Sequence, residues 1–411
     1  MPELLSPAGN REKMEAAIRY GADAVYLAGK MFGMRSAADN FTTEELAMAV
    51  SYAHEKGVKV YVTVNTMPRG REYAALRVYL EALKTIRPDA LIIADLGVLA
   101  LAKEILPDME IHISTQANIV SAAACRAYHA MGAKRVVLAR ELSLEEIREI
   151  RRDTPDSLEL EAFIHGSMCV SYSGRCLLSG FFTARDGNRG TCAQPCRWNY
   201  HMLSATVTEE KRPDIPMPIE QINGESFIMS SKDTCMIAHI PDLMESGIDS
   251  FKIEGRMKSA YYTAVVTNTY RMAMNAYESG HYVYDPHWQK ELESVSHREY
   301  ATGYYYADAT ETANTCTNAG YIREKAYLAT AISYDAESGE ALFIQKNKVV
   351  RSQAVELLTP GRTGRAAVAE ELYDEAHNPM ESAPHPSMKF YLKLPFPVKP
   401  GDILRSGDGG F

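Results

Sequence analysis

The 411-residue chain lacks any apolar run near the roughly 18 residues that a membrane-spanning helix requires. Its first residues, MPELLSPAGN, have neither the basic start nor the long apolar stretch of a secretory signal. We therefore expect a cytoplasmic protein without a membrane partner. Thiols stay reduced in the cytoplasm, so clustered cysteines there indicate metal or redox chemistry and not disulfides.

The chain also lacks an excess of positive charge, since its net charge is −9 at pH 7. Any surface that binds a nucleic acid must therefore be a local basic patch. The HExxH motif of zinc peptidases is absent as well, because the segment AHEKG at Ala53–Gly57 has no second histidine. The remaining composition, 46% hydrophobic and 24% charged, is ordinary for a globular protein with a buried core.

Eight short apolar segments alternate with amphipathic segments through the first part of the chain. Most are rich in Val, Ile, Leu or Tyr, as strands covered on both faces should be. Capping boxes at Thr42–Glu45 and Ser143–Glu146 predict where two helices begin, and a further helix is expected around Ala260–Tyr277. The expected strands are Glu3–Ser6, Ala24–Ala28, Lys59–Asn65, Ala90–Asp95, Glu110–Gln116, Arg135–Arg140, Leu158–His165 and Ser250–Glu254.

This alternation predicts an α/β fold, a TIM-like (β/α)8 barrel over residues 1–280, in preference to an open doubly wound sheet. The connection between the seventh and eighth strands, residues 166–249, is much longer than the others and holds five of the seven cysteines. It starts at the carboxyl end of a strand, the face where barrel enzymes carry their active sites. Residues 281–325 are expected to connect the barrel to a small C-terminal all-β module, residues 326–411, where short alternating runs are divided by Gly, Pro and Asp.

The cysteines of this insertion leave three kinds of site open. Cys169, Cys176 and Cys192 have polar neighbours, which disfavours a role as apolar core residues. Only Cys192 and Cys196 are spaced like a zinc knuckle, whereas an iron–sulfur cluster tolerates irregular spacing. A nucleophilic cysteine would need a histidine partner, for which His165 is the nearby candidate.

The segment EAFIHGSMCVSYSGRCLLSG, residues 161–180, resembles the signature of peptidase family U32, E-x-F-x-x-G-[SA]-[LIVM]-C-x4-G-x-C-x-[LIVM]-S, at every fixed position. The segments LLSPAGN, NRGTCAQPCRW, SSKDTCMI, IDSFKIEGRMKS and SHREYATGYY are also similar to the family, and FPVKPGDILR resembles its C-terminal β-module. The resemblance implies an oxygen-independent RNA hydroxylase with a [4Fe–4S] cluster. It implies the ligands Cys169, Cys176, Cys192 and Cys235, with Cys196 as the alternative fourth ligand.

Among members of the family, the chain looks most like the tRNA hydroxylation proteins. These introduce a 5-hydroxyl group on the wobble uridine of tRNA, with prephenate implicated as the oxygen source. The resemblance therefore implies tRNA, a small anionic co-substrate and a second U32-family protein as partners. The family name records a collagenase-like peptidase, which is the alternative function, and a non-catalytic iron–sulfur accessory subunit is a third.

Polar residues at the ends of several expected strands should meet at the barrel mouth. Glu254 and His165 are the catalytic candidates there. Arginine and lysine at such positions suit phosphate or a dicarboxylate, and the start of the helix after strand eight adds free N–H groups. Tyr172 and Trp198 could stack on a base. The substrate-binding candidates are Arg256, Lys258, Arg140, Arg175, Asn65 and Gln116.

Overall fold

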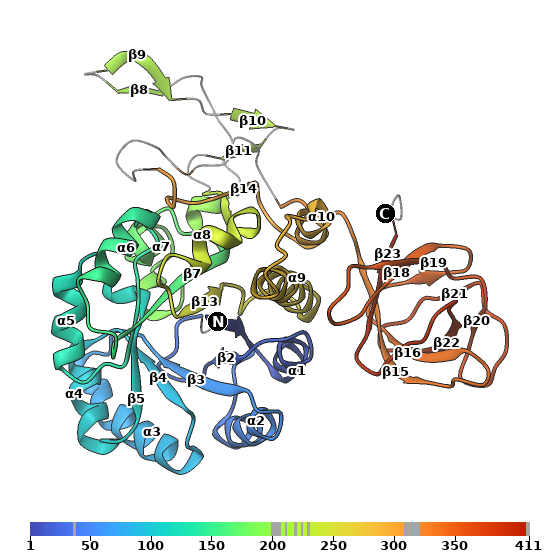
Figure 1. Ribbon diagram of the computed structural model, residues 1–411, viewed down its shortest axis with the longest axis horizontal. Helices are drawn as coiled ribbons and strands as arrows, with labels where there is room; N and C mark the ends of the chain where they lie inside the picture. Colours follow the sequence, from blue (N-terminus) through green and yellow to red (C-terminus); the bar gives the residue numbers. More distant parts are fainter. Residues whose placement is uncertain are drawn as a thin grey trace. The chain divides into compact units, whose positions relative to one another are not determined.

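The computed structural model describes residues 1–35, 38–198, 207–209, 212–217, 220–222, 225–227, 231–307, 314 and 321–407. The chain forms two compact units (Figure 1). One comprises Met1–Asn10, Ala24–Met257 and His297–Tyr321, and the other comprises Arg11–Asp23, Lys258–Ser296 and Ile322–Phe411. The domain boundaries expected from the sequence stay predictions. Within the described residues, no helix combines the length and the apolar character needed to cross a bilayer.

A closed barrel of eight parallel strands forms the centre of the first unit (Figure 1), which confirms the expected fold class. The strands pair in the order β13-β1-β2-β3-β4-β5-β6-β7, and the pairing of β13 with β7 closes the barrel. Every expected strand is present, with ends that differ by a few residues. The strands are β1 (Glu3–Pro7), β2 (Ala24–Leu27), β3 (Lys59–Val64), β4 (Ala90–Ile93), β5 (Glu110–Ile113), β6 (Arg135–Val137), β7 (Glu159–Ser167) and β13 (Ser250–Ile253).

The barrel strands are buried on both faces, because helices cover the outside and side chains fill the inside. All four residues of β2 and of β4 are buried. Five helices of this unit follow β2 to β6 in turn and lie outside the strands (Figure 1). They are α2 (Thr43–Glu55), α3 (Tyr73–Ile86), α4 (Leu96–Ile105), α5 (Ala122–Ala130) and α6 (Leu144–Arg152).

Both predicted capping boxes are present. The Thr42 amide donates to a Glu45 carboxylate oxygen at 2.8 Å, and the Glu45 amide donates to the Thr42 hydroxyl oxygen at 3.2 Å. Ser143 and Glu146 make the same reciprocal pair at the start of α6. These bonds satisfy N–H groups that the first turn of a helix cannot use internally, which is why each helix begins where the sequence predicts.

The barrel interior contains a buried ionic layer. Glu161 on β7 accepts from Lys252 on β13 at 2.6 Å and from Arg135 on β6 at 3.0 Å. Arg135 also contacts Glu3 at 2.6 Å. The pKa of Lys252 is lowered because burial outweighs the attraction of Glu161. Of these residues, Lys252 also lines a cavity at the barrel mouth.

The insertion between β7 and β13 contains short helices and strands. Its strand β12 (Asp233–Cys235) pairs antiparallel with β7 and parallel with β14 (Tyr300–Ala301). Because β12 adds pairing beyond the barrel, β7 continues to Ser167 instead of ending at His165. The other elements are η3 (Tyr172–Gly174), α7 (Leu178–Thr183), η4 (Gly187–Arg189), η5 (Pro195–Arg197), β8 (Val207–Glu209), β9 (Arg212–Met217), β10 (Glu220–Ile222), β11 (Glu225–Phe227), η6 (Ile237–His239) and α8 (Ile240–Met244).

The second unit contains helices α1 (Arg11–Arg19), α9 (Ala260–Glu278) and α10 (Pro286–Glu293) and the predicted all-β module. Its main sheet is antiparallel, in the order β19-β18-β23-β15-β16-β22-β20. The strands of the module are β15 (Tyr327–Tyr334), β16 (Glu340–Gln345), β17 (Val349–Val350), β18 (Ala354–Leu358), β19 (Arg365–Val368), β20 (Leu372–Tyr373), β21 (Ser382–Ala383), β22 (Lys389–Lys393) and β23 (Ile403–Ser406).

Candidate functional site

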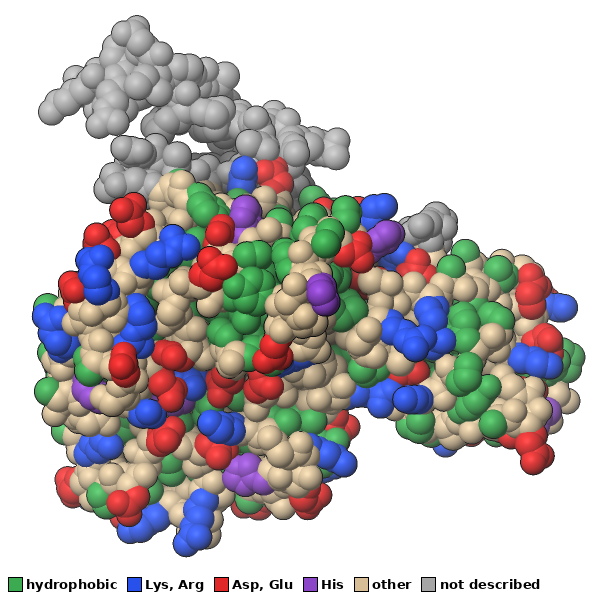
Figure 2. Space-filling model, viewed as in Figure 1, with side chains coloured by type: hydrophobic (Ala, Val, Ile, Leu, Met, Phe, Trp, Pro, Cys, Tyr) green, Lys and Arg blue, Asp and Glu red, His purple; other side chains and the backbone are tan. Residues whose placement is uncertain are grey.

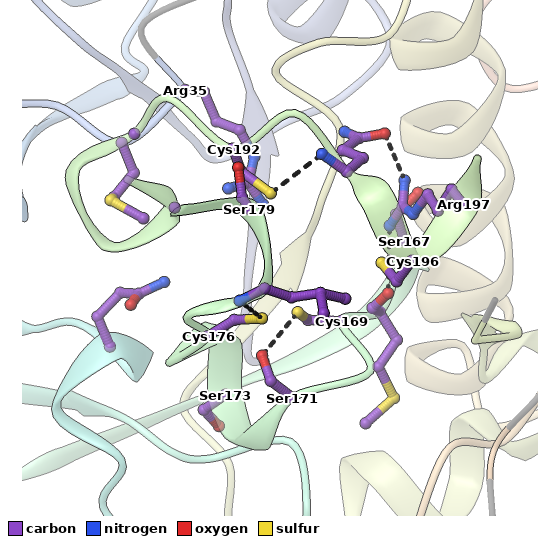
Figure 3. A pocket seen from close by; sticks show the side chains of 18 of the residues that line it. Arg35, Ser167, Cys169, Ser171, Ser173, Cys176, Ser179, Cys192, Cys196 and Arg197 are labelled. Atoms are coloured by element: carbon purple, nitrogen blue, oxygen red, sulfur yellow. Dashed lines mark hydrogen bonds between the residues drawn. The ribbon is translucent and has the colours of Figure 1, made fainter. Parts of the chain in front are cut away.

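Four cysteines of the insertion line one cavity at the carboxyl end of the barrel (Figure 3). They are Cys169, which follows β7, Cys176, between η3 and α7, and Cys192 and Cys196, which flank Gln194. The cavity has a volume of about 120 Å³. Thiols that are separate in the chain are thus brought together on the face where barrel enzymes carry their active sites.

Hydrogen bonds from the chain reach the sulfur atoms of this cavity. The amide of Leu178 donates to Cys176 Sγ and the amide of Gln194 donates to Cys192 Sγ, each at 3.3 Å (Figure 3). Cys169 Sγ lies 3.1 Å from the Ser171 hydroxyl oxygen. Backbone N–H groups directed at sulfur stabilise the thiolate form, which is the form that binds metals.

The thiols of this cavity interact electrostatically with charged neighbours. The pKa of Arg35 is raised mainly by Glu254, and Cys169 and Cys192 also raise it. Burial raises the pKa of Cys196, Arg197 opposes this, and the other three cavity cysteines add to it. The other three cavity thiols thus disfavour the thiolate form of Cys196, and a positive partner would offset their effect.

Hydrogen bonds within the insertion, and an ion pair to the turn after β3, hold the cysteine-bearing segment in place. Asn188 makes two hydrogen bonds with the backbone of Cys176, accepting from its N–H at 3.1 Å and donating to its carbonyl at 3.0 Å. Arg189, the next residue, forms an ion pair with Glu72 in the turn η1 (Gly70–Glu72) after β3. These contacts position Cys176 and the segment leading to Cys192 over the barrel mouth.

Cys235 is placed differently from the other candidate ligands. It is buried on β12, where it pairs in register with His165 on β7, and it is not among the residues that line the cavity. Cys196 occupies the fourth position on the cavity wall instead. In the part of the chain that the structure describes, no three His, Cys, Asp or Glu side chains form a group ready to hold a metal ion.

A second cavity, of about 60 Å³, lies inside the barrel mouth. Residues from seven barrel strands or the loops after them reach it, as the sequence predicts for a barrel mouth. Arg35, Gln116 and Arg140 line both cavities, so the two spaces adjoin. The charged and amide side chains around the inner cavity are Arg35, Asn65, Gln116, Arg140, Lys252, Glu254 and Arg256.

Glu254 is the carboxylate of the inner cavity. Its two oxygens lie 3.6 Å from Arg35 Nη2 and 3.6 Å from Arg140 Nη2. Burial would raise its pKa, but Arg35, Arg140, Arg256 and Lys252 together hold the pKa below its usual value. Glu254 therefore stays ionised and orients two guanidinium groups, which makes it a poor acceptor for a proton.

Arg256 is a buried cation beside Glu254. Its Nη1 lies 3.5 Å from the Thr63 hydroxyl, and burial lowers its pKa to about 10. A buried guanidinium in a cavity favours an anionic ligand, because an anion offsets the loss of hydration. The inner cavity thus combines four cationic side chains with a single carboxylate among its lining residues.

Besides Cys235, three predicted site residues do not line either cavity. Lys258 donates to the carbonyl of Ser296 at 2.8 Å and lies over the ring of Tyr262. Arg175 donates to the backbone carbonyl of Gln116 at 3.0 Å and so holds the turn that contains Gln116. His165 is buried with its ring 5.3 Å from that of Tyr300.

A β-bulge explains the position of His165. Lys252 pairs with Phe163 and the next residue, Ile253, pairs with His165, so one residue of β7 is extra. Such a bulge re-aims the following side chains. Strict alternation from Glu161 would have directed His165 into the barrel. The bulge also brings Gly166 so close to Glu254 that a Cβ would lie 2.4 Å from the Glu254 carbonyl oxygen.

The substrate-binding candidates from the sequence did not include Arg35 and Lys252, although Lys252 is one of the basic residues near the end of the eighth strand. Arg35 lies in the loop after β2, eight residues beyond the end of the strand, so its position is not indicated by the strand end itself. Lys252 interrupts the otherwise apolar strand SFKI, and a charged residue in a buried strand is itself a signal. Lys252 and Arg35 both line the inner cavity.

Exposed apolar side chains surround the cysteine-bearing segment. Tyr172, Leu177, Phe182 and Trp198 are all exposed, Leu177 by 82%. The rings of Phe182 and Trp198 lie 6.3 Å apart. Acidic and basic side chains are interspersed on the face drawn in Figure 2, so charge there is not gathered into one basic field. The segment between His165 and Tyr200, in contrast, has four arginines and one aspartate.

Comparison with known proteins covers nearly the whole chain. Residues 9–315 match the model described as peptidase family U32, and residues 323–405 match its C-terminal domain. The chain is 37% identical to tRNA hydroxylation protein P1 of Bacillus subtilis, over 99% of this chain and 95% of that protein. It is 36% identical to tRNA hydroxylation protein P of Escherichia coli, over 87% and 86%.

A third relative acts on a different RNA. The chain is 37% identical to the 23S rRNA 5-hydroxycytidine C2501 synthase of Escherichia coli, over 67% of this chain and 39% of that protein.

Proposed function

The chain belongs to peptidase family U32, and from this we propose that it is an RNA hydroxylase that modifies tRNA. The observation that carries the proposal is the set of four thiols around one cavity at the barrel mouth. Three relatives bear names that describe hydroxylation of RNA, and two of these match this chain over most of both lengths. The proposed target is the wobble uridine and the proposed product its 5-hydroxyl derivative.

We propose that Cys169, Cys176, Cys192 and Cys196 hold a [4Fe–4S] cluster. The donor set supports this, since four thiols line the cavity and backbone amides already donate to two of the sulfurs. The thiols surround a space instead of meeting at a point, which suits a cluster better than a single ion. Such a cluster supplies one-electron chemistry or a Lewis-acidic iron.

Cys196 is preferred to Cys235 as the fourth ligand for a geometric reason. Cys196 is on the turn η5 and lines the same cavity as the other three thiols. Cys235 is held in register opposite His165 by the pairing of β12 with β7, so it would have to leave a strand to reach the cavity. A loop residue moves more readily than a residue in a ladder of backbone hydrogen bonds.

The inner cavity is proposed to bind a small anionic co-substrate, of which prephenate is the candidate. Arg256 is buried there and presents a guanidinium to any carboxylate that enters, while Arg140 and Lys252 add positive charge. Glu254 keeps Arg35 and Arg140 oriented between the two cavities. A co-substrate in the inner cavity would thus lie beside the thiols and out of bulk water.

The exposed aromatic side chains around the cysteines suit an RNA loop. Unpaired bases stack on exposed aromatic rings, and arginines attract the phosphates. Tyr172 and Trp198 are both exposed on the segment that carries the four thiols. RNA bound there would place an unstacked base over the cysteine-lined cavity.

The structure favours a hydroxylase over the peptidase of the family name. A cysteine peptidase needs a histidine within reach of its nucleophile. No histidine in the described part of the chain lines either cavity, and His165 packs against Tyr300.

Mass spectrometry of tRNA from a deletion strain tests the proposal. Nucleosides from this strain should lack a hydroxylated uridine that the parent strain contains, and the wild-type gene should restore it. Restoration by a Cys169→Ser variant would show that the thiols are not needed, and unchanged tRNA in the deletion strain would refute tRNA hydroxylation. Purified protein that modifies tRNA without a second U32-family protein would exclude the accessory-subunit role.

A further inference from the structure

Gln116 occupies a distinctive place between the two cavities. It lines both of them and belongs to the turn η2 (Thr115–Ala117) that follows β5. Its backbone is held at both polar atoms: the N–H donates to the Ser114 hydroxyl at 3.3 Å, and the carbonyl accepts from Arg175 Nε at 3.0 Å. The backbone of Gln116 is therefore held in the wall of the site by both of its polar atoms.

The side-chain amide of Gln116 is buried and incompletely used. The residue is only 8% exposed, and its Oε1 has no hydrogen-bond partner within the described residues. A buried acceptor left without a donor has lost its hydration without compensation, which destabilises the folded state. Native proteins seldom retain such a group unless a ligand, an ion or a water completes it.

Gly174 of the family signature explains how the amide fits. A Cβ on Gly174 would lie 2.8 Å from Gln116 Nε2, closer than two such atoms can approach. The amide nitrogen thus lies against the backbone of the cysteine-bearing segment. Any residue larger than glycine at position 174 would displace the amide from its place between the cavities.

The other amide of the barrel mouth provides a contrast. Asn65 accepts from the Met34 amide through Oδ1 at 3.0 Å, and it donates to the Ser114 hydroxyl through Nδ2 at 3.3 Å. Both ends of Asn65 are thus occupied by the protein, and its role is to hold the loop after β2. Gln116 has the same functional group with its oxygen still available.

We propose that Gln116 Oε1 accepts a hydrogen bond from the N3–H of the uracil ring that is hydroxylated. The inference rests on the proposed function and deepens it by naming the residue that reads the base. Enzymes that modify a base take it out of the stack and read its Watson–Crick edge. On uracil this edge has one N–H, at N3, and it is the complement of an unpartnered acceptor.

The geometry also orients the reacting atom. In the uracil ring C6 lies opposite N3 and C5 is bonded to C6, so a hydrogen bond at N3 directs the C5–C6 edge away from Gln116. Gln116 lines the cysteine cavity on the side of Gly174, and the thiols form other parts of the same wall. A base anchored at N3 by Gln116 therefore has its C5 edge turned into the cavity that the thiols surround.

A pair of RNA substrates and a pair of variants test the proposal. The substrates are anticodon stem-loops with uridine or N3-methyluridine at the target position, since methylation replaces the N3 proton. Wild type should favour uridine by about 10- to 100-fold in kcat/KM, the effect expected for an unpaired buried polar group. Gln116→Ala should lose a similar factor on uridine and should no longer distinguish the two RNAs, because the smaller side chain admits the methyl group.

Binding and stability measurements separate base reading from a structural role. Affinity for both stem-loops, measured by fluorescence anisotropy, should follow the same pattern as kcat/KM. The matched control is Gln353→Ala, which removes a glutamine from the loop before β18 and should behave as wild type. Gln116→Met, close in size to glutamine but without the acceptor, should unfold at a temperature close to that of wild type and still lose the preference for uridine.

The outcomes distinguish this proposal from the one on which it rests. If wild type hydroxylates the uridine stem-loop and Gln116→Ala keeps the wild-type preference over N3-methyluridine, the role of Gln116 is refuted while RNA hydroxylation stands. A fall in activity that is equal on both RNAs would likewise assign Gln116 to the wall of the cavity alone. If wild type modifies no RNA, the proposed function itself fails.

Discussion

Arg189 donates two hydrogen bonds to the Glu72 carboxylate, one from Nη1 at 2.8 Å and one from Nη2. Arg189 is in the insertion and Glu72 is in the turn after β3, so the pair joins segments that are 117 residues apart in the chain. It is a two-pronged contact of the kind in which arginine and a carboxylate match each other's geometry. The cysteine-bearing segment is thereby held to the rigid barrel.

Replacement of Arg189 should loosen the cysteine-bearing segment. Because both side chains are partly exposed, Arg189→Ala should lower the free energy of unfolding by no more than about 1 kcal/mol. Iron and sulfide content should fall more clearly, because Cys192 is three residues further on. Arg77→Ala is the control, since Arg77 pairs with Glu104 on the exposed surface. Equal cluster content in the two variants would show that the ion pair does not position the thiols.

The same pair predicts a response to acid. Hydrogen bonds from Arg189 and from the Arg69 amide lower the pKa of Glu72 from 4.5 to about 2. A carboxyl whose pKa is lower in the folded state stabilises it above pH 4.5, and this contribution is lost as the pH falls toward 2. In urea unfolding, the difference between wild type and Glu72→Gln should be constant above pH 4.5 and should shrink below it. A difference that persists at pH 2 would contradict the assignment.

Serine variants decide which cysteine is the fourth ligand. Cys169→Ser and Cys196→Ser should lose most of the bound iron and the visible absorbance after anaerobic purification, because each removes a thiol from the cavity. Cys235→Ser should retain both, since Cys235 belongs to the β12 ladder. The reverse result for Cys196 and Cys235 would make Cys235 the ligand, as the sequence resemblance first implies.

Arg256 should be required for hydroxylation and dispensable for the cluster. Arg256→Ala removes the most deeply buried guanidinium of the inner cavity, so activity should fall by about 100-fold or more while iron content stays at the wild-type level. Lys258→Ala should retain activity, because Lys258 is bonded to Ser296 instead of lining the cavity. Full activity of Arg256→Ala would show that Arg256 only supports the fold.

The ionic layer inside the barrel should contribute to stability. Glu161→Gln leaves the buried Lys252 and Arg135 without the carboxylate they share, and we expect the free energy of unfolding to fall by roughly 3–5 kcal/mol. Glu104→Gln breaks only an exposed pair and should change it by about 0.5 kcal/mol or less. Urea unfolding measures both. Similar values for the two variants would show that the layer adapts to the loss of charge.

Local sequence patterns determined the strands and several helix starts. Strands such as β2 and β4 are apolar throughout because both of their faces are buried, and this pattern is legible without any knowledge of neighbours. The capping boxes at Thr42 and Ser143 act within one helical turn, so they too could be predicted. The order and number of the strands then favoured a barrel. In a barrel, residues that follow the strands meet at the mouth, as Asn65, Gln116, Arg140, Glu254 and Arg256 do.

Only the tertiary structure decided which cysteines and which polar residues share a cavity. Spacing along the chain does not distinguish Cys196 from Cys235, but the antiparallel pairing of β12 with β7 keeps Cys235 away from the cavity wall. Likewise, one extra residue in β7 turned His165 toward Tyr300. Bulges and strand pairings between distant segments depend on packing across the whole fold, and no local pattern encodes them.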